Sequence, residues 1–225
     1  MKYAHTLLLA AALLCGLFLA APATEASAAG PNPVVIMETS MGRIIVMLSP
    51  KDAPKTVENF LKYVDAGFYD KTVFHRVIKQ KVRPGSITKA KSKNDSMNIV
   101  QGGGFNLQMM KKTPLYPPLV NEAAIGLLNT KGTIAMARTD APDSATSEFF
   151  FNMEDNPVLD RKQTFSKVGV GNFNANTQAG YCAFGKVIRG MDVIEKIHGI
   201  RTISRGRMDD VPVDTVILKK AYRAK

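Results

Sequence analysis

Residues 74–78 read Phe-His-Arg-Val-Ile, and residues 99–105 read Ile-Val-Gln-Gly-Gly-Gly-Phe. Because side chains alternate between the two faces of a strand, Phe74, Arg76 and Ile78 are predicted to share one face. A guanidinium among apolar side chains must find partners or face a cleft, since burying an unpaired charge is costly. The amide oxygen of Gln101 could hold that guanidinium in place. Arg76 is therefore a candidate functional residue, although this stretch alone would favour a structural salt bridge.

Short apolar runs separated by turn residues surround these two segments. Residues 34–39 and 43–48 are β-rich runs on either side of a glycine-containing turn, which predicts a hairpin. Further strands are predicted at 72–78, 99–101, 132–137, 148–152, 181–187 and 215–222. A chain of many short strands favours a closed antiparallel barrel, because closure removes exposed edges. The predicted fold class is therefore mostly β, in a single domain.

Two helices are predicted beside the strands. Apolar residues recur with helical spacing between residues 57 and 64, where Asp52 could cap the start and Gly67 could end the helix. A second, shorter helix is predicted at 191–197, with Gly199 as its stop signal.

The N-terminal segment differs from the rest of the chain. Lys2 precedes an apolar stretch at 7–21, and residues 26–28 read Ala-Ser-Ala, which together predict a secretory signal peptide over residues 1–28. The apolar stretch is shorter than the roughly 20 residues that span a bilayer. We therefore expect a periplasmic or secreted protein whose domain occupies residues 31–225, with no membrane span after signal cleavage.

The content of cysteine, histidine and glycine excludes several kinds of site. Beyond the leader, Cys182 is the only cysteine, and its apolar neighbours predict an inert core thiol. One cysteine with His75 and His198 offers too few ligands for a usual zinc site. No G-x-S-x-G motif is present, and the glycine clusters at 102–104 and 169–171 do not match phosphate-binding loops. We expect neither a metal nor a cofactor.

The net charge of +11 raises the possibility of an anionic partner. Nearly half of the excess lies between residues 79 and 96, a stretch rich in Ser, Lys and Asn that has no aromatic residue for stacking on bases. This pattern indicates a solvated loop and argues against specific nucleic-acid binding. An adaptor for anionic surfaces remains an alternative function.

Five motifs occur in the order found in cyclophilins, the peptidyl-prolyl cis-trans isomerases of the barrel type. They are Phe-His-Arg-Val-Ile at 74–78, Gln-Gly-Gly at 101–103, Gly-Thr-Ile-Ala-Met-Ala at 132–137, Ser-Glu-Phe-Phe at 147–150 and Phe-Gly-Lys-Val at 184–187. The chain resembles this family over residues 34–222, apart from insertions near 79–97 and 162–180, and is most similar to its exported bacterial branch. The resemblance implies an eight-stranded antiparallel barrel with two capping helices. It also implies an enzyme that isomerises X-Pro bonds in unfolded or exported polypeptides. We expect the protein to be a monomer.

The resemblance also assigns roles to individual residues. Arg76 would be catalytic, donating a hydrogen bond to the prolyl nitrogen of a twisted amide, and Gln101 would orient it. The implied substrate-binding residues are Phe74, Ile99, Ala137, Arg138, Glu148, Phe150, Leu159 and Tyr181. Among them, Phe150 and Leu159 would line the recess for the proline ring.

The sequence departs from the family pattern near this site. Asn98 stands where a phenylalanine is usual, Glu148 replaces a glutamine, and Val158 replaces a common tryptophan. We expect Glu148 to pair with Arg138, which would leave Arg76 free, rather than with Arg76 itself. A non-catalytic proline-peptide-binding chaperone on the same fold is the alternative to an enzyme.

Overall fold

The computed structural model describes residues 31–79, 97–123, 126–167 and 173–224. The predicted signal peptide, residues 1–28, and nearly all of the basic segment at 79–96 lie outside these ranges.

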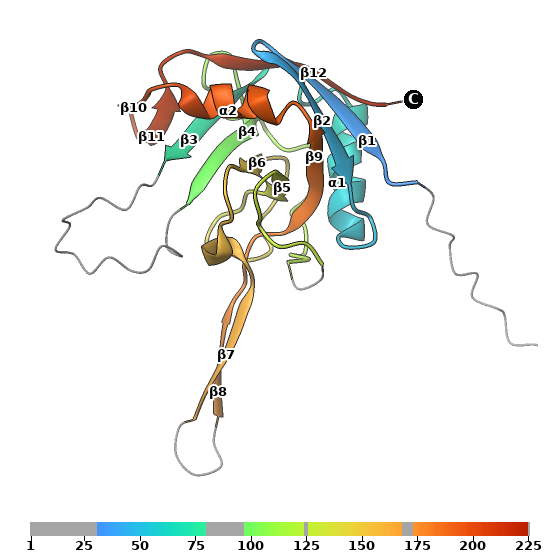
Figure 1. The fold of residues 1–225 in the computed structure, drawn as a ribbon, viewed down its shortest axis with the longest axis vertical. Coiled ribbons are helices and arrows are strands. Elements are labelled where there is room, and N and C mark those ends of the chain that lie inside the picture. The colour runs from blue at the N-terminus through green and yellow to red at the C-terminus, as the bar shows by residue number, and fades with distance from the viewer. Residues whose placement is uncertain (1–30, 80–96, 124–125, 168–172, 225) are drawn as a thin grey trace, which may run out of the picture.

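Eight strands close into an antiparallel barrel in the order β1-β12-β3-β4-β6-β5-β9-β2 (Figure 1). Their bounds are β1 Val34–Thr39, β2 Gly42–Leu48, β3 Thr72–Lys79, β4 Asn98–Asn106, β5 Thr133–Met136, β6 Phe149–Asn152, β9 Ala183–Arg189 and β12 Val216–Arg223. The last strand lies between β1 and β3, so the two ends of the domain close the barrel together. The predicted fold class is confirmed.

Helix α1 (Pro54–Asp65) packs its apolar face on the barrel core, and Gly67 ends it as predicted. The backbone N–H of Gly67 donates to the carbonyl of Val64, and Gly67 has a φ of +62°, a conformation that glycine adopts without strain. Asp52, in contrast, is not the N-cap. The first turn is satisfied by the carboxylate of Glu122, which accepts hydrogen bonds from the backbone N–H groups of Lys55 and Thr56 at 3.2 and 2.8 Å.

Helix α2 (Met191–Gly199) lies where it was predicted and buries Val193, Ile194 and Ile197. Its N-cap, Gly190, has a φ of +89°, and a Cβ there would collide with the backbone around Arg43 on β2. Glycine at this position therefore allows α2 to pack against β2.

The core fills the barrel with aromatic side chains. Phe149 and Phe151 point inward and contact one another with ring centroids 5.6 Å apart, while Phe60 of α1 meets Phe149 edge-on at 5.9 Å. Phe150, between the two inward residues, belongs to a separate hydrophobic cluster. The sheet around β6 is therefore apolar on both faces, and its outward face is available for function.

An irregularity in β3 changes which side chains face outward. The pairing of β3 with β4 shifts between Phe74 and Arg76, so that Phe74 and Val77 both lie in the core, whereas Ile78 joins the outward cluster. A bulge adds a residue to one strand and so reverses the facing of the residues beyond it. The prediction that Phe74 shares a face with Arg76 and Ile78 is therefore wrong.

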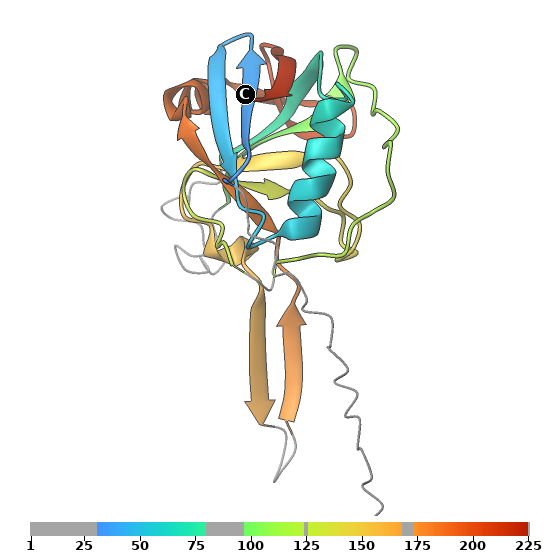
Figure 2. The same cartoon turned by 90° about the vertical axis from the view of Figure 1, so that its right-hand side faces the viewer.

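Two additional hairpins were not predicted. Strands β7 (Lys162–Lys167) and β8 (Phe173–Gln178) form an arm that projects from the barrel, as Figure 2 shows, and within the described ranges they pair only with each other. Most of the insertion near 162–180 is this arm. Strands β10 (Thr202–Arg205) and β11 (Met208–Pro212) form a second hairpin that lies beside β3 (Figure 1).

Candidate active site

The register of the barrel places the candidate residues in one row. Arg76 on β3 pairs with Gln101 on β4, Gln101 pairs with Phe150 on β6, and Phe150 pairs with Ala135 on β5. Directly opposed residues of antiparallel strands have their side chains on the same face. The row therefore sets a guanidinium, a carboxamide and an aromatic ring side by side on the outward face.

An apolar cluster, which we call the outer cluster, adjoins the row. It consists of Ile78, Ile99, Ala135, Phe150, Leu159 and Ala183, with Met97, Leu127, Ala137, Val158 and Tyr181 packed at its edge. Leu159 reaches it from the short 3-10 helix η2 (Pro157–Leu159), immediately before the arm. The predicted substrate-binding residues Ile99, Ala137, Phe150, Leu159 and Tyr181 are thus brought together.

Tyr181 and Arg138 form a wall beside Phe150. The rings of Phe150 and Tyr181 meet edge-on with centroids 5.7 Å apart. The guanidinium of Arg138 lies 4.4 Å from the centroid of the Tyr181 ring, and its Nε donates to the carbonyl of Gly180 at 2.9 Å. The cation–π contact and the hydrogen bond together hold this wall in place.

The guanidinium of Arg76 is accessible. Its side chain is 42% exposed, and Nε lies 3.8 Å from Oδ2 of Asp210 on β11. Within the described part of the chain, no hydrogen bond to this guanidinium is formed, so its N–H donors can serve a ligand.

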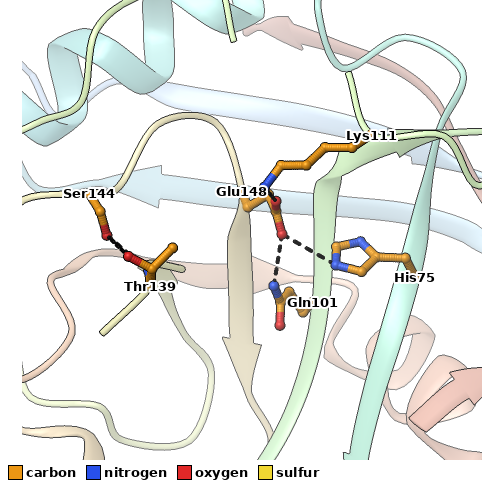
Figure 3. A network of polar contacts seen from close by, with 6 residues as sticks. All are labelled: His75, Gln101, Lys111, Thr139, Ser144 and Glu148. Carbon is orange, nitrogen blue, oxygen red and sulfur yellow. Dashed lines mark hydrogen bonds and ion pairs between the residues drawn. The ribbon is translucent and has the colours of Figure 1, made fainter. Parts of the chain in front are cut away.

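Glu148 does not pair with Arg138 or with Arg76, so the expected pairing with Arg138 is wrong. Figure 3 shows its carboxylate between three partners from other segments. Oε2 accepts a 2.9 Å hydrogen bond from Nε2 of Gln101 and lies 3.3 Å from Nε2 of His75, while Oε1 lies 3.3 Å from Nζ of Lys111. Arg138 points instead to the carbonyls of Gly180 and Thr139.

These partners keep Glu148 ionised. Burial of the carboxyl group raises its pKa, but the hydrogen bonds and charges of His75, Lys111 and Gln101 outweigh burial, and the pKa falls from 4.5 to about 2. Glu148 is therefore a permanent anion at physiological pH, held within the protein and not offered to Arg76.

Sequence and structure comparisons place this geometry in a known family. The family model described as "Cyclophilin type peptidyl-prolyl cis-trans isomerase/CLD" matches residues 34–223. The chain belongs to this family.

Bacterial relatives of this cyclophilin match most of its length. A peptidyl-prolyl cis-trans isomerase of Streptomyces antibioticus is 43% identical over 83% of this chain and 96% of its own. Peptidyl-prolyl cis-trans isomerase B of Escherichia coli K12 is 41% identical over the same shares, and isomerase A of Dickeya dadantii is 40% identical over 88% of each chain. A crystal structure of a Cryptosporidium parvum cyclophilin, determined in the presence of the dipeptide Ala-Pro, aligns with a TM-score of 0.59 and 21% identity over 85% of this chain and 99% of its own. At 21% identity, the similarity to the Cryptosporidium parvum protein shows a shared fold alone.

Phe74 lies apart from the candidate site of this cyclophilin. Its side chain is 2% exposed and packs in the barrel core, with the ring of Phe149 at 6.3 Å. Phe74 belongs to the core cluster and not to the outer cluster, so the structure does not bring it together with Ile99, Phe150 and Leu159. The bulge in β3 is the physical reason.

A hollow of about 170 Å³ opens beside Gln101 and Glu148, bounded also by Lys111, Arg138 and the Thr139–Ser144 turn. In Figure 3, Thr139 and Ser144 lie across this space from Glu148, and their hydroxyls are hydrogen-bonded at 2.8 Å. Ala137 lines the hollow and also packs at the edge of the outer cluster, so the two adjoin.

Three residues that the sequence analysis did not place at the site belong to it, namely His75, Lys111 and Asp210. The sequence analysis considered His75 only as one of too few ligands for a zinc site. It lies buried against Phe105, with the ring centroids 4.4 Å apart. Lys111 and Asp210 carry no local pattern, because their partners are more than 30 residues away in the sequence.

Other reactive groups of the described residues lie outside the site. Cys182 is buried, as predicted, and burial raises the pKa of its thiol to about 11. No group of three or more His, Cys, Asp or Glu side chains within the described ranges is arranged to hold a metal ion. No helix of those ranges is long and apolar enough to cross a membrane.

Proposed function

We propose that this chain accelerates the cis–trans isomerisation of X-Pro bonds in polypeptides. The reaction requires no bond to break, but amide resonance imposes a barrier of about 18–20 kcal/mol, so the uncatalysed step is slow. A catalyst needs to bind the proline and favour the twisted amide over the planar one.

The outer cluster would bind the pyrrolidine ring. Phe150 and Leu159 supply the apolar contact, Ile99 adjoins them on β4, and Tyr181 with Arg138 limits the other side. Contact with such a surface removes apolar area of the ring from water. The proline is then fixed beside Gln101 and Arg76 by the register of β6, β4 and β3.

Arg76 would stabilise the twisted amide. When the C–N bond rotates out of plane, the prolyl nitrogen loses resonance and regains a lone pair. A guanidinium keeps its charge and presents several N–H donors in a fixed plane, so it can donate to that lone pair more strongly in the transition state than in the ground state. Each tenfold acceleration requires about 1.4 kcal/mol of this preference.

The single observation that carries the proposal is the row that joins Arg76, Gln101 and Phe150 across three strands, with the guanidinium exposed. The test is a proline-limited refolding assay of wild type and Arg76→Ala. Arg223→Ala is the matched control, because Arg223 is also a half-exposed strand arginine with an aspartate partner, Asp65. We expect wild type and Arg223→Ala to accelerate proline-limited refolding, and Arg76→Ala to lose this acceleration. Absence of acceleration by wild type would support the alternative of a non-catalytic binding module, and equal acceleration by wild type and Arg76→Ala would show that Arg76 is not the catalytic group.

We also propose that the protein is exported and acts as a monomer on unfolded or newly exported proteins in the periplasm or outside the cell. The support is the pattern of residues 1–28, together with a row and a cluster that come from one chain. Cell fractionation with N-terminal sequencing tests export, and a mature protein starting near residue 29 is expected. A cytosolic protein that retains Met1 would contradict it. Sedimentation at micromolar concentration should give the monomer mass.

A further inference from the structure

The carboxylate of Glu148 determines how the amide of Gln101 is oriented. An ionised carboxylate only accepts hydrogen bonds, whereas a carboxamide has a donating nitrogen at one end and an accepting oxygen at the other. Gln101 can therefore meet Glu148 only through its NH₂ group, as the 2.9 Å contact from Nε2 shows. In Figure 3 the Gln101 nitrogen faces Glu148 and its oxygen points away from it.

A glutamine at position 148 would not impose this orientation. Its carboxamide could accept from Gln101 or donate to it, so both orientations of the Gln101 amide would keep a hydrogen bond. The anion at position 148 removes one of the two, because a flipped amide would set its oxygen against a carboxylate oxygen. Glutamate in place of the family's usual glutamine at position 148 thus restricts the Gln101 amide to one orientation.

The surroundings of Glu148 hold it in place and keep it charged. His75 faces it from β3 and Lys111 from the segment after β4, and Arg138, which bounds the same hollow, is engaged with backbone carbonyls instead. His75 is 3% exposed, and its Nδ1 has no hydrogen-bond partner among the described residues, so Glu148 is the polar contact of that ring.

Gly104 provides the space for the Glu148 side chain. A Cβ built on Gly104 would lie 2.7 Å from Oε1 and would collide with the Cγ of Glu148. The φ of Gly104 is not in the left-handed region, so the backbone itself would accept alanine. Glycine at this position therefore has a steric role, which is to let the carboxylate lie over β4.

We propose that Glu148 is a positioning residue that fixes the Gln101 amide with its oxygen directed away from Glu148, toward Arg76 and the bound peptide. This inference rests on the proposed function. Gln101 is the strand partner of Arg76, so the amide that Glu148 orients belongs to the residue next to the guanidinium. Lys111 supplies a positive charge beside Glu148 and His75 contacts the same carboxylate, and neither competes for Gln101.

A mutant cycle between Glu148 and Gln101 tests the proposal. The measured quantities are kcat and KM for isomerisation of an X-Pro tetrapeptide. Glu148→Ala is expected to lower kcat/KM about tenfold in the wild-type background, mainly through kcat, and less than about twofold in a Gln101→Ala background. Glu148→Gln should recover activity to within about threefold of wild type, since its carboxamide oxygen can still accept from Gln101.

Gly104→Ala gives a second perturbation without touching either polar residue. It should reproduce the loss seen in Glu148→Ala and cause no further loss in that variant. Two controls match these changes. Glu122→Ala removes a carboxylate whose hydrogen bonds, among the described residues, go to the start of α1, and Gly199→Ala adds a methyl group where no atom lies within 4 Å. Both should leave kcat/KM unchanged.

The side-chain amide NMR signals of Gln101 report the orientation independently of activity. We expect resolved signals, one of them shifted by the bond to the carboxylate, in wild type and their collapse to solvent-like values in Glu148→Ala. Equal losses of kcat/KM for Glu148→Ala in both backgrounds, or Gln101 signals that do not change, would overturn the proposal. If wild type has no isomerase activity the proposed function fails, while the NMR comparison still decides whether Glu148 orients Gln101.

Discussion

The Nε atom of Arg76 lies 3.8 Å from the Oδ2 atom of Asp210, so the guanidinium has an anionic neighbour to which it is not hydrogen-bonded. The two side chains are 42% and 37% exposed, and ion pairs in such surroundings contribute only about 0–1 kcal/mol. The β10–β11 hairpin therefore biases the direction of the guanidinium and leaves its donors accessible.

Asp210→Asn should raise kcat/KM slightly, by no more than about threefold at low salt, because it removes a negative charge that competes with the substrate for Arg76. Asparagine is the matched replacement, since Asp210 has a φ of +61° and asparagine tolerates that conformation. The measurement is tetrapeptide isomerisation at low and high salt. A loss of more than tenfold would mean that Asp210 supports Arg76 rather than competing with it.

The ionised state of Glu148 predicts a pH dependence of stability. Its pKa is about 2 in the folded protein, below the ordinary value of 4.5. The contribution of the ionised Glu148 carboxylate to the free energy of unfolding is therefore fully present above pH 4.5 and is lost as the pH falls toward 2. The shift corresponds to about 3 kcal/mol at neutral pH. In urea unfolding at pH 6 and pH 3, the difference in unfolding free energy between wild type and Glu148→Gln should narrow at pH 3. A constant difference would contradict the depressed pKa.

Phe74 and Phe150 should respond differently to the same change, since one lies in the barrel core and the other in the outer cluster. Phe74→Leu should lower the free energy of unfolding by on the order of 1 kcal/mol and leave KM unaltered. Phe150→Leu should raise KM severalfold as well. Thermal melts and steady-state kinetics on both variants separate the two effects, and a raised KM in Phe74→Leu would return that residue to the substrate-binding set.

The β7–β8 arm should be dispensable for folding and for small substrates. Lys162 and Gln178 are strand partners at its base, and the backbone N–H of Tyr181 donates to the carbonyl of Leu159 just below. Replacing residues 163–177 by Asn-Gly should therefore form a two-residue hairpin turn and preserve the outer cluster. We expect the melting temperature and the tetrapeptide kcat/KM to stay close to wild type. A large loss of either would show that the arm contributes to the barrel or to the site.

Local patterns in the sequence predicted much of the barrel. The β1–β2 hairpin, both helices and the final strand follow from alternation, helical spacing and turn residues, all of which are local signals. The arm and the β10–β11 hairpin were missed, because neither shows the clear apolar alternation of a half-buried strand.

The details of the site depended on contacts that no local pattern encodes. The motifs led to Arg76, Gln101 and Phe150, which the barrel register then placed in one row. The position of Phe74 was mispredicted because a one-residue bulge reverses a strand's facing without a mark in the sequence. The partners of Glu148 come from three separate segments, which no local pattern links to it. Opposite charge therefore led to the prediction of Arg138 as its partner, whereas the fold brings His75 and Lys111 to the carboxylate.

Isomerisation of a proline tetrapeptide by Arg76 variants tests the central claim most directly. Arg76→Ala should lower kcat/KM by about a hundredfold or more, the usual effect of removing a donor that acts in the transition state. Arg76→Lys, which keeps the charge but loses the planar donors, should recover only part of it. Arg223→Ala should match wild type. If Arg76→Ala retains more than about half of the wild-type kcat/KM, the guanidinium is not the group that stabilises the twisted amide.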